Sequence, residues 1–103
     1  MVTVFISLED QTKAKQIAEA LLKEKLVAEI RIDYNNHVFN MVNDEIIEKT
    51  TCILTMQTKG MLFNEVMHYV QSRFGNEIPV YSVPITQGNE SLTNQIRNNT
   101  KFI

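Results

Sequence analysis

Hydrophobic and polar positions change their period twice between residues 2 and 32. Residues 2–7 are a run of mostly β-branched and aromatic side chains, which is typical of a buried strand. Residues 27–32 alternate small or apolar side chains with charged ones, the pattern of a strand with one solvated face. Between them, apolar residues recur three and four positions apart: Ala14, Ile17, Ala18, Leu21 and Leu22. The pattern predicts a strand, a helix and a strand, with the helix packed on a sheet.

Two carboxylates, Glu9 and Asp10, stand where this helix begins. Side-chain oxygens at a helix N-terminus accept hydrogen bonds from the free N–H groups of the first turn, and the helix dipole favours negative charge there. The same pair would suit a cation, but capping accounts for it without a ligand. We therefore expect Asp10 to cap the helix.

The next segment is extended and interrupted by polar residues. Residues 33–36 are a polar cluster, and asparagine tolerates the left-handed backbone of tight turns, so we predict a hairpin turn there. Strand structure should resume at residues 37–42, kink or bulge at residues 43–44, and continue over residues 46–57. A strand that long extends beyond its own sheet and leaves backbone groups free to pair with another chain. The segment over residues 38–57 therefore predicts a contact between subunits.

A second unit of strand, helix and strand completes the chain. Thr58 is expected to cap a helix that ends at Gly75, where glycine takes the positive φ of a helix terminus. Residues 78–85 form a strand with two prolines, which cannot donate ladder hydrogen bonds, so the strand should lie at a sheet edge. A short helix follows over residues 90–98. We predict one α+β domain over residues 1–103, a ferredoxin-like βαββαβ sandwich with an antiparallel sheet and a C-terminal helix.

Composition narrows the classes of partner. The chain has 103 residues and a formal net charge of -2, so it offers no excess positive charge to a nucleic-acid backbone. No apolar run approaches the roughly 20 residues that cross a bilayer, and the N-terminus lacks a signal-peptide pattern. We expect a cytoplasmic protein that contacts neither nucleic acid nor membrane. Cys52 is the only cysteine, which excludes a disulfide within the chain.

Candidate metal ligands and nucleophiles are few and far apart in the sequence. His37 and His68 are expected to be solvated, and Cys52, in an apolar strand, to be a buried and unreactive thiol. The pattern contains no acid–base pair, so we predict no catalytic residue, no cofactor and no cofactor-binding residue. No metal site is identified within one chain. Only a threefold axis would gather enough ligands, as a ring of His37, Glu29 or His68.

Short motifs along the chain follow the order found in one protein family. Residues 4–7 and 21–28 are similar to that family's first strand and its "LL…E(R/K)L(I/V)A" helix exit. Residues 53–58 are similar to its "LLIKT" strand end, and residues 62–63 to its "LW" pair. Residues 78–92 are similar to its "VP…LPI…GN…YL" ending, with one residue fewer between the prolines. The chain therefore resembles the CutA family, the divalent-cation tolerance proteins, over nearly its whole length.

The resemblance implies a homotrimer of ferredoxin-like subunits whose long strands pair between chains. It also implies a non-enzymatic role in divalent metal-ion tolerance or response, with weak binding of a divalent cation such as copper. Several family positions differ: Glu29 stands in place of a cysteine, residues 41–45 in place of "WEGK", residues 74–76 in place of "HPY", and Gln57 in place of a lysine. The residues through which the family would bind a metal are therefore largely absent.

A PII-like signalling trimer that binds a small anionic ligand in clefts between subunits is the alternative. It would share the architecture, so the fold does not separate the two functions. A protein that binds an anionic ligand in these clefts needs basic side chains near them, and residues 34–43 contain no lysine or arginine. This composition favours the metal-tolerance function.

Overall fold

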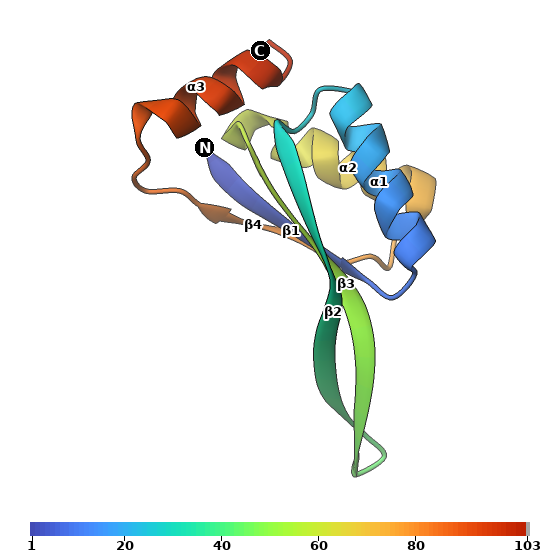
Figure 1. Cartoon of the computed structure of the whole chain (residues 1–103). Coiled ribbons are helices and arrows are strands. Elements are labelled where there is room, and N and C mark those ends of the chain that lie inside the picture. The colour runs from blue at the N-terminus through green and yellow to red at the C-terminus, as the bar shows by residue number, and fades with distance from the viewer. Residues whose placement is uncertain (103) are drawn as a thin grey trace.

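The computed structural model describes residues 1–102, which form a four-stranded antiparallel sheet with helices against it (Figure 1). The strand order is β2-β3-β1-β4, the predicted ferredoxin-like βαββαβ plan with an added C-terminal helix. None of the helices within residues 1–102 is long and apolar enough to cross a membrane. The elements are β1 (Val2–Leu8), α1 (Gln11–Lys23), β2 (Glu29–Val42), β3 (Glu45–Thr58), a 3₁₀ turn (Gly60–Leu62), α2 (Phe63–Phe74), β4 (Val80–Pro84) and α3 (Glu90–Asn99).

Helices α1 and α2 cover one face of the sheet (Figure 1). Alternate residues of β1 and β3 point into this layer and meet the apolar stripes of both helices. The fully buried side chains of the core include Val4, Ile6, Ile17, Leu21, Leu54, Met56, Leu62, Val66 and Val70. Burying a side chain of this size contributes about 1.5–3 kcal/mol, so this layer holds the domain together. Helix α1 begins as predicted, because the Asp10 carboxylate accepts the Lys13 N–H at 3.0 Å.

The hairpin turn does not lie where the sequence pattern placed it. Strand β2 runs through residues 33–36, where it carries a β-bulge opposite β3, and the chain reverses at Asn43 and Asp44. These two residues have φ of 51° and 64°, the positive values that a two-residue type I′ hairpin loop requires and that Asn and Asp tolerate. The predicted turn at residues 33–36 and kink at residues 43–44 are therefore wrong. The overlong segment is two paired strands of 14 residues each.

Local hydrogen bonds explain why the polar cluster bends β2 without reversing it. The Asp33 carboxylate accepts the Asn35 N–H at 2.9 Å, a short-range bond typical of turns. The Asn36 amide donates to the Thr51 hydroxyl at 3.0 Å and so holds β2 against β3 directly after the bulge. These turn-forming residues therefore form a bulge and do not reverse the chain, because β2 pairs with β3 on both sides of the bulge.

Helix α2 begins later than predicted. Thr58 is the last residue of β3, and its buried hydroxyl donates to the Leu26 carbonyl at 2.6 Å, so the expectation that it caps a helix is wrong. In this position the hydroxyl satisfies a buried carbonyl of the loop after α1. A 3₁₀ turn intervenes and α2 starts at Phe63. The helix ends at Gly75 as predicted; its φ of 150° is unfavourable for other residues, and a Cβ there would collide with the Glu77 carboxylate.

Strand β4 lies at the sheet edge, as its prolines predicted. It is shorter than residues 78–85, because Pro79 precedes the ladder and β4 covers only Val80–Pro84. The last helix is close to its predicted range, and its N-cap is Asn89, whose amide oxygen accepts the Leu92 N–H at 3.0 Å. Figure 1 shows α3 at the end of the sheet where the N-terminus also lies.

Asn43→Val is expected to lower the free energy of unfolding by about 1–2 kcal/mol, because a β-branched residue opposes the positive φ of the turn. Asn43→Gly is the matched control: it removes the same side chain, but glycine adopts a positive φ without a steric penalty, so stability should change by less than about 0.5 kcal/mol. Guanidinium unfolding at one protein concentration measures both. Equal stability of the two variants would contradict the position of the turn.

Cys52→Ala is expected to lower the free energy of unfolding by about 1 kcal/mol, because the side chain is only 1% exposed and packs in the core. The expected result is a small fall in the thermal midpoint with an unchanged circular dichroism spectrum. A thiol reagent provides the second test. If it labels Cys52 equally fast in the native and the unfolded protein, the thiol is not buried.

Candidate functional site

The most distinctive feature of the molecule is a hairpin that leaves the sheet. Strand β1 pairs with β3 only as far as Cys52, so residues 36–51, called the arm below, pair only with each other. In Figure 1 the arm projects away from the helices and from both ends of the chain. Its two outer edges therefore have no neighbouring strand within residues 1–102.

Both faces of the arm carry exposed apolar side chains. Cross-strand pairing places Phe39, Met41 and Ile46 on one face, where they are 63%, 65% and 72% exposed. The other face carries Val42 and Ile47, also exposed. A two-stranded ribbon is only marginally stable alone in water, and exposed apolar clusters mark interaction sites. The arm therefore has the composition of a segment that is buried in an assembly.

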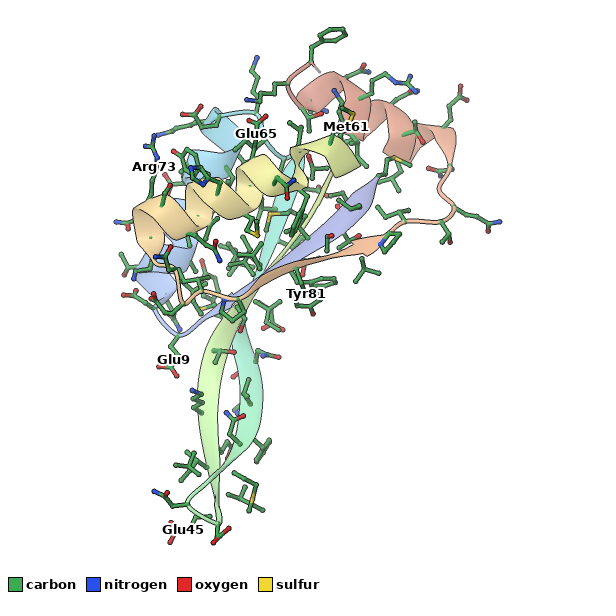
Figure 2. The ribbon with its side chains drawn as sticks, turned by 180° about the vertical axis from the view of Figure 1, so that it is seen from behind. Glu9, Glu45, Met61, Glu65, Arg73 and Tyr81 are labelled. Carbon is green, nitrogen blue, oxygen red and sulfur yellow. The ribbon has the colours of Figure 1, made fainter. Side chains whose placement is uncertain are left out.

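The helix-free face of the sheet is a second apolar surface. The rings of Phe5 and Tyr81 stack with their centroids 5.0 Å apart, and Val83 lies beside them two residues along β4. Tyr81 and Val83 are 55% and 46% exposed. Figure 2 shows Tyr81 on the side of β4 that points away from α2. This face is covered by no element of residues 1–102.

A cavity of about 510 Å³ lies where the arm joins the sheet. The end of β1, the start of α1, the loop before β4 and the first residues of the arm all contribute side chains to it. Glu9 lies at this junction (Figure 2), and its carboxylate pairs with the Lys49 ammonium of the arm at 3.0 Å. Both partners are about half exposed, so this pair positions the arm more than it stabilises the fold.

The residues considered as metal ligands lie apart. His37 is exposed as predicted, but on β2 and not beside a turn, and its Nδ1 lies 3.0 Å from a Glu48 carboxylate oxygen. Glu29 pairs with Arg31 at 2.9 Å, and His68 is exposed on α2 as predicted. Residues 1–102 contain no group of three or more His, Cys, Asp or Glu side chains arranged to hold a metal ion. The rings about a threefold axis stay a prediction.

Cys52 is buried, as its sequence context predicted. Burial raises the pKa of the Cys52 thiol, and the negative charges of Asp10 and Asp33 raise it further. A thiol with a raised pKa is mostly protonated near neutral pH and reacts slowly. The environment therefore suits a packing role.

Sequence reasoning missed the cavity at the base of the arm. Its lining comes from four separate segments, and no spacing rule connects Glu9 with Lys49 before the register of the hairpin is known. The exposed apolar residues of the arm were visible in the sequence as strand formers. The misplaced turn concealed that they lie on both faces of one ribbon.

Solved structures with the same fold include proteins named CutA1. That of Thermus thermophilus, a divalent cation tolerance protein, is 24% identical and superposes with a TM-score of 0.85 over 98% of this chain and 100% of its own. That of Ehrlichia chaffeensis is 20% identical, with a TM-score of 0.88 over 98% and 95%. That of Pyrococcus horikoshii is 18% identical, with a TM-score of 0.88 over 99% and 100%. At these identities the likeness shows the fold.

Sequence comparison assigns the family. A comparison with curated proteins finds no match. The sequence model of the CutA1 divalent ion tolerance protein family matches residues 2–99, which is nearly the whole chain. The chain therefore belongs to the CutA1 divalent ion tolerance family.

Proposed function

We propose that the protein acts as a non-enzymatic homotrimer of the CutA type, in which the arm of each chain is buried by neighbouring copies. The observation that carries this proposal is the apolar character of both faces of the arm, together with its two unpaired edges. Free strand edges invite pairing with another chain, and burial of both faces needs contacts on two sides. A single flat partner would leave one face in water.

The same chain supplies a surface suited to receive the arm. The helix-free face of the sheet, with Phe5, Tyr81 and Val83, is apolar and lies on a different part of the molecule from the arm. Contact between two different patches is heterologous, and a heterologous contact that closes on itself gives a ring. This supports a cyclic assembly, and the resemblance to the CutA family indicates that the assembly has three subunits.

The proposed role is in divalent-ion tolerance or response, as in the family description, without a tight metal site in one chain. Zinc and copper sites use three or four nitrogen, sulfur or carboxylate ligands at fixed positions. The described residues do not fit this requirement, because His37 and His68 lie on different elements and Cys52 is buried. A cation would bind weakly, or through copies of one residue about the threefold axis.

A non-enzymatic role agrees with the side chains at the arm. General acid–base catalysis needs a titratable group placed beside a reactive position, and nucleophilic catalysis needs a nucleophile beside a base. Two pairs of ionisable groups of the arm and its base are instead engaged with each other: Glu9 with Lys49, and His37 with Glu48. The PII-like alternative gains no support here, because carboxylates outnumber ammonium groups in the cavity at the base of the arm.

Light scattering tests the assembly. The native protein is expected to have the mass of three chains, and Phe39→Asp is expected to dissociate it, because burying an unpaired carboxylate costs several kcal/mol. Met61→Asp is the matched control, since Met61 is 80% exposed and lies at the opposite end of the molecule from Glu45 at the tip of the arm (Figure 2). A monomeric native protein, or a Phe39→Asp variant that assembles as well as Met61→Asp, would contradict the proposal.

Calorimetry with copper or zinc at neutral pH tests the metal hypothesis. The expected dissociation constant lies in about the millimolar to high-micromolar range, as for surface histidine. His37→Ala and His68→Ala, measured separately, should each change it little. Submicromolar binding at one site per three chains, abolished by either substitution, would show instead that symmetry builds a metal site.

A further inference from the structure

One apolar face of the arm contains a single pair of titratable side chains. Directly opposite residues of two paired strands share a face, and on this face the register pairs are His37 with Thr50, Phe39 with Glu48, and Met41 with Ile46. Of these six side chains only those of His37 and Glu48 titrate, and Glu48 lies directly opposite Phe39. The acid therefore lies within the apolar surface that the proposed trimer buries.

The His37 ring has an oxygen beside each of its nitrogens. Its Nδ1 lies 3.0 Å from a Glu48 carboxylate oxygen, and its Nε2 lies 3.1 Å from the Asn35 amide oxygen. A neutral imidazole carries one N–H and satisfies only one of these oxygens, whereas the protonated ring donates to both. The two acceptors therefore match the hydrogen-bonding capacity of the protonated ring.

Glu48 depends on His37 for a counter-charge. Within residues 1–102, His37 is the one hydrogen-bond or ion-pair partner of the Glu48 carboxylate. Lys49 follows Glu48 on β3 and therefore points to the opposite face of the arm, where it pairs with Glu9 at 3.0 Å. The other titratable side chains of the arm and the bulge are acids or phenols: Asp44, Glu45, Tyr34 and Asp33.

The helix-free face, which is proposed to receive the arm of a neighbouring copy, carries a cation that is already paired. Arg31 shares this face with Phe5, because both are in register with Thr55. Its guanidinium pairs with Glu29 at 2.9 Å, and Asp33 follows on the same face two residues along β2. Carboxylates therefore exceed cations on the strands of this face, and a neighbouring copy brings no free counter-charge to the buried acid.

Burial makes the protonation state of the pair decisive. In one chain both side chains are about half exposed, so water solvates the carboxylate. A carboxylate that is buried without a counter-charge is strongly unfavourable, whereas a protonated His37 makes the pair neutral and its hydrogen bond charge-assisted. Imidazole side chains change their charge between about pH 5 and 8. Assembly that buries this pair therefore takes up protons in that range.

We propose that the His37–Glu48 pair is a proton-controlled switch of assembly, an inference that rests on the proposed burial of the arm. A proton that is bound more tightly in the assembly than in the free chain stabilises the assembly at low pH, and this contribution is lost as the pH rises. The trimer is therefore strengthened at about pH 6 and weakened at about pH 8.

Sedimentation velocity in urea, at one protein concentration and at about pH 6 and pH 8, tests the switch. Urea carries no charge, so it does not screen the ion pair as a salt would. The urea concentration at which half of the native trimers dissociate is expected to be about 0.5 M lower at the higher pH.

Two substitutions of the pair should act in opposite directions. Glu48→Gln removes the acid, so its midpoint should be the same at both pH values and exceed the native midpoint at the higher pH. His37→Gln leaves the acid without a partner, so its midpoint at the lower pH should fall to about the native value at the higher pH. His68→Gln is the matched control, because His68 is exposed on α2, outside the arm, and its variant should keep the native pH dependence.

Three results would overturn the proposal: equal native midpoints at the two pH values, the same pH dependence in His37→Gln and His68→Gln, or a Glu48→Gln trimer that is weaker than the native one at the higher pH. The mass without urea separates this proposal from that of the trimer. A native protein with the mass of one chain at the lower pH refutes both, whereas a trimer whose dissociation is independent of pH refutes only the switch.

Discussion

Strand β3 has 14 residues and its central partner β1 has 7, and this difference in length shapes the molecule. The two-residue loop at Asn43 and Asp44 joins β2 and β3 so tightly that the two strands pair as far as the tip. The sheet ends where β1 ends, but the hairpin continues. The open edges of the arm follow directly from this mismatch, whereas its apolar faces come from the exposed side chains of Phe39, Met41 and Ile46 and of Val42 and Ile47.

Most of the fold could be predicted from the sequence, because it depends on hydrophobic period. The helical stripe of α1, the cap at Asp10, the glycine at the end of α2 and the edge position of β4 all follow from local rules. The hairpin could not be placed by those rules. Residues 33–36 and residues 43–44 both have turn-forming side chains, and only the pairing of β2 with β3 decides which of them reverses the chain.

The candidate sites were less predictable, since they depend on which segments the fold brings together. The expectation that Cys52 is buried was confirmed, because a thiol in an apolar strand obeys a local rule. The cavity joins residues as distant as Lys13, Lys49 and Glu77, and the hydrophobic surface of the arm is defined only by cross-strand register. Membership of the CutA1 family fixes the architecture, but a shared architecture does not identify a ligand.

Hydrogen–deuterium exchange of the arm amides in the native protein tests most directly whether neighbouring copies bury the arm. A ribbon free in water opens readily and its outward-facing amides have no partner, so it would exchange as fast as exposed loops. The account predicts that amides of residues 37–50 exchange as slowly as those of β1 at the centre of the sheet. Exchange of the arm at the rate of an unfolded peptide, while β1 stays protected, would contradict it.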